Sequence, residues 1–177
     1  EAQEITPELA ESFKLPATEG AIIAGVLRGS PADRAGIPIE VYSFIGTSPI
    51  RQFAESWDAE FLTKAIVSSI REAVAAGLSF CLVTEDTTRS HPDMLRTLYR
   101  AAVDAGAKRL CLCDTTGHVT PYGVEELVGF VRRELDSMGA THVGLDWHGH
   151  NDRGLALENA LWALEFGADR VHGTALG

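Results

Sequence analysis

The side chains best suited to chemistry in this sequence lie in four short polar segments. The most specific of these is His148-Gly149-His150. In an extended chain, residues i and i+2 project to the same side, so both imidazoles can reach one metal ion. Oxygen ligands from Glu85, Asp114 or Asp146 would complete a set suited to Mn, Zn, Fe or Mg. The simpler interpretation is that both histidines are hydrated side chains of a surface loop.

The other three segments carry hydroxyl, carboxylate and guanidinium groups, and they cover residues 47–51, 84–89 and 114–118. Glu85 is a candidate for the active site, with a solvated turn or a helix cap as the alternative. Arg51 and Arg89 can each clamp a carboxylate through two parallel hydrogen bonds, or can equally be surface charges. The sequence contains neither a glycine-rich phosphate-binding loop of the Walker or dinucleotide type nor a nucleophile elbow.

The three cysteines, Cys81, Cys111 and Cys113, all lie in apolar runs. Cys111 and Cys113 share one side of an extended segment, but buried cysteines are common in strands, which favours unreactive thiols over metal or redox chemistry. His172 also lies in an apolar run, where a hydrogen-bonded core histidine is more common than a ligand. The small, odd number of cysteines indicates a reducing compartment without disulfides, and we predict a cytoplasmic location.

From about residue 39 onward the sequence repeats one unit, which consists of an apolar run, a polar turn, an amphipathic helix and a glycine. The glycines that end the helices, Gly77, Gly106, Gly139 and Gly167, are 29, 33 and 28 residues apart. This is the period of βα units joined by right-handed crossovers. We therefore predict an α/β fold, either a barrel or a doubly wound sheet, with function at the carboxyl ends of its strands.

The strands of this repeat are predicted at residues 41–45, 80–83, 110–113, 143–145 and 170–172, because these runs are short and almost wholly apolar. The first helix places Leu62, Ile66, Ile70 and Val74 on one stripe. Later helices are predicted between Ser90 and Gly106, between Thr120 and Gly139, and from about Arg153 to Phe166.

Composition excludes several classes of function. The chain has 177 residues, 15 of them Lys or Arg and 25 Asp or Glu, which gives a formal net charge of −10. Binding to nucleic acid or to an anionic membrane needs clustered basic residues, so we expect neither partner. The hydrophobic content of 45% predicts a folded core, but no apolar run approaches a membrane span and the first residues do not form a signal peptide.

Residues 1–38 do not follow the βα period. We predict a strand at residues 21–27 and a short helix at residues 30–36, which begins with a serine cap and a proline and ends at a glycine. The sequence therefore divides into an N-terminal segment, residues 1–38, and a βα-repeat domain, residues 39–177.

The βα-repeat domain resembles part of the DRE-TIM metallolyase superfamily, and within it the branch of the 2-isopropylmalate, homocitrate and citramalate synthases. The matching motifs are Thr47–Ile50, Glu85–Ser90, Asp114–Pro121, His148–Ala156 and Gly173–Gly177. The resemblance implies a (β/α)8 barrel that binds a divalent metal (Mg, Mn or Zn) and a 2-oxo acid. Its synthases condense the enolate of acetyl-CoA onto the keto carbon of that acid.

The resemblance also implies roles for individual residues. His148 and His150 would be metal ligands, and Glu85 would be a catalytic residue that organises metal and substrate. Thr115 would be a second catalytic residue and would hold the substrate carboxylate, with Arg89 and Thr174 as further substrate-binding residues.

The sequence departs from the family pattern in ways that affect activity. The Arg-Asp pair of the family's first strand and the strand end that supplies its fourth ligand have no counterpart, and Arg51 stands where many members have a histidine. The resemblance thus covers strands three to seven, which predicts a partial (β/α) barrel of about five units. We expect impaired catalysis, residual metal binding and self-association as a homodimer or larger oligomer, with an active acyltransferase or lyase as the alternative.

Residues 3–36 resemble the first part of a PDZ domain from high-temperature-requirement-type serine proteases, which are periplasmic. The carboxylate-binding loop of such domains has no counterpart, so a peptide-binding module is the weakest of the functions considered. Two truncated resemblances that meet at Ala35-Gly36-Ile37 predict a chimera, engineered or selected. A natural protein with a divergent N-terminus is the alternative.

Overall fold

The computed structural model describes residues 2–4, 21–23 and 40–174, in two compact units that comprise residues 1–39 and 40–177. In the first unit, strands β1 (Ala2–Glu4) and β2 (Ala21–Ile23) pair in antiparallel fashion. β2 lies within the strand predicted at residues 21–27. The short helix predicted at residues 30–36 lies outside the described residues, so the PDZ resemblance stays a prediction.

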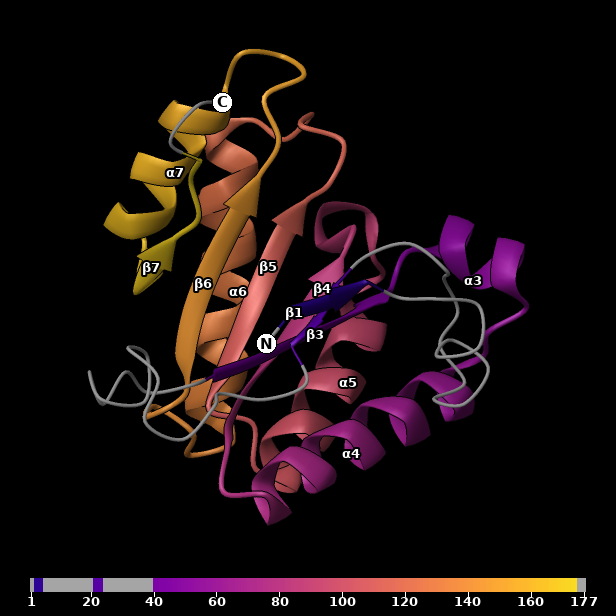
Figure 1. Ribbon diagram of the computed structural model, residues 1–177. Coiled ribbons are helices and arrows are strands. Elements are labelled where there is room, and N and C mark those ends of the chain that lie inside the picture. The colour runs from indigo at the N-terminus through magenta and orange to yellow at the C-terminus, as the bar shows by residue number, and fades with distance from the viewer. Residues whose placement is uncertain (1, 5–20, 24–39, 175–177) are drawn as a thin grey trace. The chain divides into compact units, whose positions relative to one another are not determined.

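The second unit is built on five parallel strands in the order β3-β4-β5-β6-β7 (Figure 1). The strands are β3 (Glu40–Gly46), β4 (Ser79–Glu85), β5 (Arg109–Asp114), β6 (Gly144–Gly149) and β7 (Arg170–Val171). The helices between them are α3 (Pro49–Glu55), α4 (Ala59–Ala75), α5 (Pro92–Ala105), α6 (Pro121–Ser137) and α7 (Ala156–Glu165), with a short 3-10 turn, η1 (Thr87–Arg89), after β4. The predicted partial (β/α) barrel is confirmed, because each strand pairs with the next along the chain through a helical crossover.

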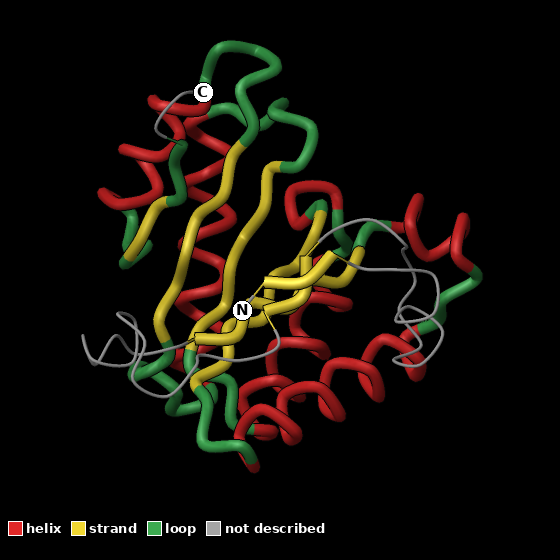
Figure 2. The backbone as a smooth tube through the Cα atoms, in the orientation of Figure 1, coloured by secondary structure: helices red, strands yellow, loops and turns green. Residues whose placement is uncertain are grey.

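The strands of the second unit form one sheet (Figure 2). Along these strands, successive side chains point to opposite faces of the sheet. Leu110 and Leu112 of β5, like Leu145 and Trp147 of β6, pack into the main hydrophobic core with the helices. The residues between them point to the opposite side of the sheet, which we call the cavity face. The buried stripe of α4 contains Leu62, Ile66 and Ile70 as predicted, but Val74 is 45% exposed and Ala73 takes its place.

The sheet is strongly curved, as in a barrel. Glu40 on β3 and Arg170 on β7 form an ion pair of 2.8 Å, although the three strands β4, β5 and β6 lie between β3 and β7. Adjacent strands lie about 4.8 Å apart, so a flat sheet would hold these two strands about 19 Å from each other. Curvature therefore brings side chains from the two edges of the sheet together on the cavity face.

Three local features differ from the sequence-based predictions. Residues 49–55, for which the sequence predicted no helix, form α3, because Ser48 caps its first turn and Pro49 fits the first helical position. Strand β6 continues beyond residue 145 to Gly149, so Asp146 and His148 lie within a strand and not in a loop. Helix α7 begins three residues later than Arg153, since Gly154 has a positive φ of 72° that ends any helical path there.

No helix in residues 40–174 is both long enough and apolar enough to cross a membrane.

Replacing the buried Leu98 of α5 tests how much the hydrophobic core contributes to the free energy of unfolding of the second unit. Leu98 is fully buried, so Leu98→Ala should lower the free energy of unfolding by about 2–5 kcal/mol in urea titrations. Leu161 of α7 is 60% exposed, and Leu161→Ala should change it by no more than about 0.5 kcal/mol. Equal losses in the two variants would contradict the core described above.

Candidate functional site

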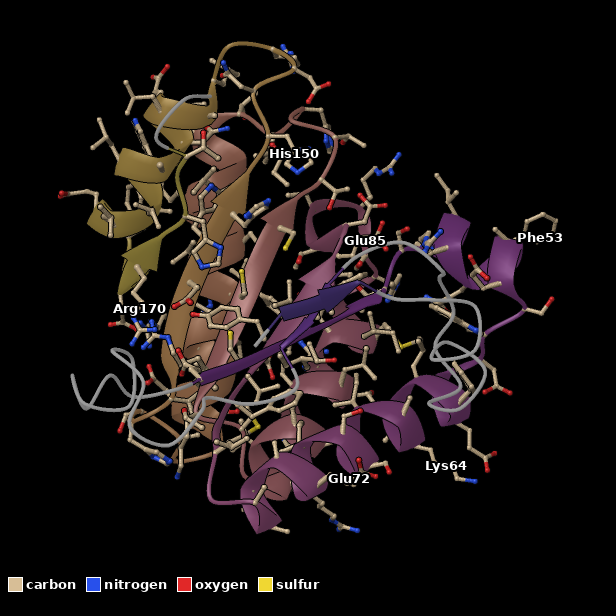
Figure 3. All side chains as sticks on the ribbon, viewed as in Figure 1. Phe53, Lys64, Glu72, Glu85, His150 and Arg170 are labelled. Atoms are coloured by element: carbon tan, nitrogen blue, oxygen red, sulfur yellow. The ribbon has the colours of Figure 1, made fainter. Side chains whose placement is uncertain are left out.

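A cavity of about 420 Å³ lies on the cavity face of the sheet, toward the carboxyl ends of the strands. Four of the six residues that the sequence assigned to a site line it, namely Glu85, Thr115, His148 and His150. Figure 3 labels Glu85 and His150, which lie near the ends of β4 and β6. The structure therefore brings together side chains that are up to 65 positions apart in the sequence, because parallel strands end at the same edge of a sheet.

The two histidines of the His148-Gly149-His150 motif lie side by side. Their ring centroids are 5.3 Å apart and their planes are inclined at 66°. Burial, together with the neighbouring His172 and His150, lowers the pKa of His148 below its usual value. A neutral imidazole keeps a nitrogen lone pair free, which metal binding and proton acceptance both require.

The donor chemistry of this pair fits a divalent transition metal, since imidazole nitrogens are common ligands of Zn and Fe. Within residues 40–174, however, no three His, Cys, Asp or Glu side chains converge as a ligand set. Asp114 and Asp146, considered above as oxygen ligands, do not line the cavity. The structure thus supplies two donors, and the predicted metal site stays a prediction.

Asp114 instead holds the β5–α6 loop in shape. Its carboxylate is fully buried and accepts hydrogen bonds from the backbone N–H groups of His118 and Val119, at 3.2 and 3.1 Å. The Thr88 hydroxyl donates a third, at 3.3 Å. The carboxylate is therefore occupied by the loop that carries Thr115.

Glu85, the last residue of β4, faces a cation. Its Oε2 lies 3.2 Å from Nε of Arg51, whose Nη1 also lies 3.2 Å from Glu55 on α3. A Cβ at Gly46 would lie 2.7 Å from that same Oε2, so only glycine leaves room for the carboxylate there. Arg51 therefore balances the charge of Glu85 at the edge of the cavity.

Thr115 has a hydroxyl that can donate into the cavity. Its Oγ1 accepts a hydrogen bond of 2.8 Å from the backbone N–H of Asp86, which leaves the hydroxyl proton for another partner. A carboxylate group of a ligand is a suitable acceptor for that proton.

Arg89 and Thr174 lie outside this cavity. The guanidinium of Arg89 binds the buried carboxylate of Asp86 through Nε and Nη2, at 2.8 and 2.7 Å. Burial alone would raise the pKa of Asp86, but the hydrogen bonds from Arg89 and Ser48 outweigh burial, so the pKa lies below its usual value. Thr174 is exposed beyond β7. Arg89 stabilises the turn after β4, and the substrate-binding roles of both residues stay predictions.

Four residues on the cavity face, Tyr42, Arg109, Asp146 and His172, were not recognised from the sequence as a group. Asp146 is fully buried and accepts hydrogen bonds of 2.7 Å from Arg109 Nε and from the Tyr42 hydroxyl, while His172 lies 3.4 Å away. Burial would raise the pKa of Asp146, but hydrogen bonds from His172, Arg109 and Tyr42 outweigh it and hold the pKa well below its usual range. The alternation of apolar and polar residues from Leu145 to His148 is the one signal that could have placed Asp146 in a strand.

The cysteines of the cavity face are buried thiols, as the sequence indicated. Cys81, Cys111 and Cys113 cluster with Val83 on β4 and β5. Burial raises the pKa of Cys81, and a hydrogen bond with Cys113 together with burial raises that of Cys111. Both thiols therefore remain protonated and weakly nucleophilic at neutral pH.

The loops that follow β5 and β6 are packed tightly against each other. A Cβ at Gly117 would lie 2.8 Å from the backbone nitrogen of Asp152 and 2.9 Å from the carbonyl oxygen of His150. The His150 N–H also donates to the Asp114 carbonyl at 3.2 Å, and Arg153 donates to the His118 carbonyl at 2.8 Å. The position of His150 thus depends on the absence of a side chain at Gly117.

Gly117→Ala should displace the loop that carries His150. Gly139 is a matched control, because its φ of 67° resembles the 58° of Gly117 but nothing lies within 4 Å of its Cβ position. The left-handed conformation should cost both variants about 1–2 kcal/mol of unfolding free energy. Only Gly117→Ala should lose more than this and shift the imidazole resonances of His150 in NMR spectra. Indistinguishable variants would contradict the close approach of the two loops.

Comparisons of sequence identify relatives that are named as synthases. The putative (R)-citramalate synthase CimA of Methanothermobacter thermautotrophicus is 42% identical over 118 residues, which cover 67% of this chain and 22% of that protein. The 2-isopropylmalate synthase of Pyrococcus abyssi is 34% identical, over 82% of this chain and 31% of its own length. The homocitrate synthase of Saccharolobus solfataricus is 33% identical, over 98% of this chain and 39% of its own. The chain thus spans about a fifth to two fifths of these curated relatives.

Comparisons of structure support the fold alone, because the sequence identities are low. The hydroxymethylglutaryl-CoA lyase of Pseudomonas aeruginosa superimposes with a TM-score of 0.64 at 19% identity, over 82% of this chain and 49% of that one. The HMG-CoA lyase of Brucella melitensis gives 0.61 at 22% identity, over 79% and 50%.

Residues 31–177 match the family model described as HMGL-like. This match covers far more than half of the sequence, and it confirms the resemblance to the DRE-TIM enzymes at the level of the family. The protein belongs to the HMGL-like family.

Proposed function

We propose that this chain provides the 2-oxo-acid-binding part of the active site of an acyl-CoA-condensing synthase of the 2-isopropylmalate, homocitrate or citramalate type. The observation that carries this proposal is the cavity at the strand ends, which is lined by Glu85, Thr115, His148 and His150. The names of the curated relatives support the same class of reaction, in which an acyl thioester and a 2-oxo acid are joined.

Glu85, Thr115, His148 and His150 each have a role in this proposal. The Thr115 hydroxyl donates to the substrate carboxylate. Glu85, whose charge is balanced by Arg51, organises the metal and the substrate. His148 and His150 are the side chains that would hold a divalent metal, and such a metal would supply Lewis-acid polarisation of the keto group.

We also propose that turnover by this chain on its own is poor. A condensing enzyme of this type depends on its metal, and losing a ligand or the partner that orients it lowers metal affinity or activity by about 10–100-fold. In the described part of the chain the donors number two and no third one joins them. The alternative is a chain that is active as it stands, either as an acyltransferase or as a lyase.

Calorimetric titration with Mn²⁺ and Zn²⁺ tests the metal-binding part of the proposal. We expect measurable binding to the unchanged chain and a loss of about tenfold or more in affinity for His148→Ala. His142 is exposed, and His142→Ala should bind like the unchanged chain. Equal affinities for all three proteins would contradict metal binding at this cavity.

Release of CoA thiol from acetyl-CoA in the presence of a panel of 2-oxo acids distinguishes the two candidate activities. Slow, metal-dependent release of the thiol would support the proposed substrate site. Thr115→Val should then raise the KM for the 2-oxo acid. Rapid release would favour the active alternative.

We propose, further, that the chain associates with a second copy of itself. In residues 40–174, β3 and β7 each pair along one edge only, and Phe44 on β3 is 74% exposed. Exposed edges and large apolar side chains favour association.

Light scattering after size-exclusion chromatography measures the mass of the particle directly. At micromolar concentration we expect at least twice the mass of one chain, and Phe44→Ser should reduce it. Tyr122 on α6 is 69% exposed, and Tyr122→Ser should leave the mass unchanged. A monomer under these conditions would rule out self-association.

We propose, finally, that residues 1–38 are the divergent N-terminus of a natural chain. The alignment with the homocitrate synthase covers 98% of the chain, and the family match begins at residue 31. Both observations favour the alternative of a natural chain with a divergent N-terminus over a chimera with a PDZ segment of periplasmic origin. The cytoplasmic location stays a prediction from the use of cysteine.

A further inference from the structure

His172, which follows β7, connects a buried carboxylate to the cavity. Its Nε2 lies 3.4 Å from Oδ2 of Asp146, and its Nδ1 lies 3.3 Å from Nδ1 of His148. The ring of His172 meets those of His148 and Tyr42 edge-on, at centroid distances of 5.4 and 5.7 Å. Three side chains thus form a row from the interior of the sheet to the metal-binding motif.

The direction of each hydrogen bond in this row follows from Asp146. An ionised carboxylate can only accept hydrogen bonds, and the ion pair with Arg109 and the hydroxyl of Tyr42 keep that carboxylate charged and fixed. Nε2 of His172 must therefore carry the proton that it shares with Asp146.

This assignment passes along the row to His148. A neutral imidazole that donates from Nε2 can only accept at Nδ1, so Nδ1 of His148 must donate to His172. The other nitrogen of His148, Nε2, then has no proton and carries a free lone pair. His148 lines the cavity, where that lone pair is available to a ligand.

We propose that Asp146 and His172 are positioning residues that fix the tautomer and the ring orientation of His148, so that its Nε2 lone pair is presented to a divalent cation in the cavity. The tautomer follows from the contacts of Asp146 and His148 with a neutral His172, whereas the identity of the ligand rests on the proposed function. Carboxylate partners orient metal-binding histidines in the same way when they contact them directly. Here one additional imidazole extends the connection.

Charge around His172 is consistent with this role. The groups that face it are Asp146, Tyr42 and His148, and Arg170 lies 3.3 Å from the Tyr42 hydroxyl. Arg170 is paired with Glu40, and Asp146 is paired with Arg109. Each of these charges near the row therefore has a partner of opposite sign. A doubly protonated His172 would donate at both nitrogens and would impose the opposite tautomer on His148, which makes the proposal decidable.

Long-range ¹H–¹⁵N NMR correlations of the metal-free protein test the proposal at neutral pH. We expect the proton of His148 on Nδ1 and that of His172 on Nε2. A proton on Nε2 of His148 in the unchanged protein would overturn the proposal. This measurement needs no variant, so a folding defect cannot obscure it.

Two variants separate positioning from simple packing. His172→Phe keeps a ring against Tyr42 and His148 but removes both nitrogens, and His142→Phe is the control at an exposed histidine. In His172→Phe, His148 should lose its fixed Nδ1–H tautomer, and its affinity for Zn²⁺ should fall by about 10–100-fold. His142→Phe should change neither. An unchanged His148 tautomer in a folded His172→Phe protein would also overturn the proposal.

The same experiments distinguish this proposal from the proposed function. If His148 carries the expected tautomer and the protein binds no Zn²⁺ or Mn²⁺, the positioning role stands and the metal-dependent function fails. If metal binds but His172→Phe alters neither the tautomer nor the affinity, the function stands and the positioning role fails.

Discussion

The buried carboxylate of Asp146 is the group on which the arrangement of the cavity face depends. It accepts hydrogen bonds from Arg109 on the adjacent strand and from Tyr42, whose strand lies on the far side of β4 and β5. A charge in this position is tolerated only because it is paired, and removing one partner of such a pair typically costs about 3–5 kcal/mol. The curvature of the sheet brings Tyr42 and His172 to this one group, and the three contacts hold that carboxylate in place.

Curvature also explains how five strands form a site. Because the sheet bends, the strand ends converge, and side chains at or just beyond the ends of β4, β5 and β6 face one volume of about 420 Å³. The contacts between loops add a second constraint. Gly117 permits an approach that a methyl group would block, and His150 is placed by the backbone around it.

The fold of the second unit was largely predictable from local signals. Helix-ending glycines, proline at the first helical position and apolar runs recur with a period that few architectures share, and they predicted the alternating strands and helices. The extension of β6 to Gly149 was missed because Asp146 and His148 are polar. A polar strand residue is unexpected until a partner is known, and Tyr42 lies more than a hundred residues away in the sequence.

The sequence predicted which site residues lie close together where the order of the strands alone determines it. It did not predict the contacts that depend on which side chains pair. Glu85, Thr115, His148 and His150 meet because parallel strands end together. Arg89 was assigned to a substrate carboxylate, but in the structure a carboxylate of the protein, Asp86, is bound to it. His172 was interpreted as a core residue because the sequence does not show which rings curvature brings together.

The most direct measurement of this arrangement is the pKa of Asp146, from the ¹³C resonance of its carboxyl carbon during an acid titration. We expect the group to remain ionised well below the usual value of about 3.9, and the stability it contributes to be complete above that value and lost as the pH falls further. Titration of Asp146 at its ordinary value in the folded protein would contradict the view that this carboxylate organises the cavity face.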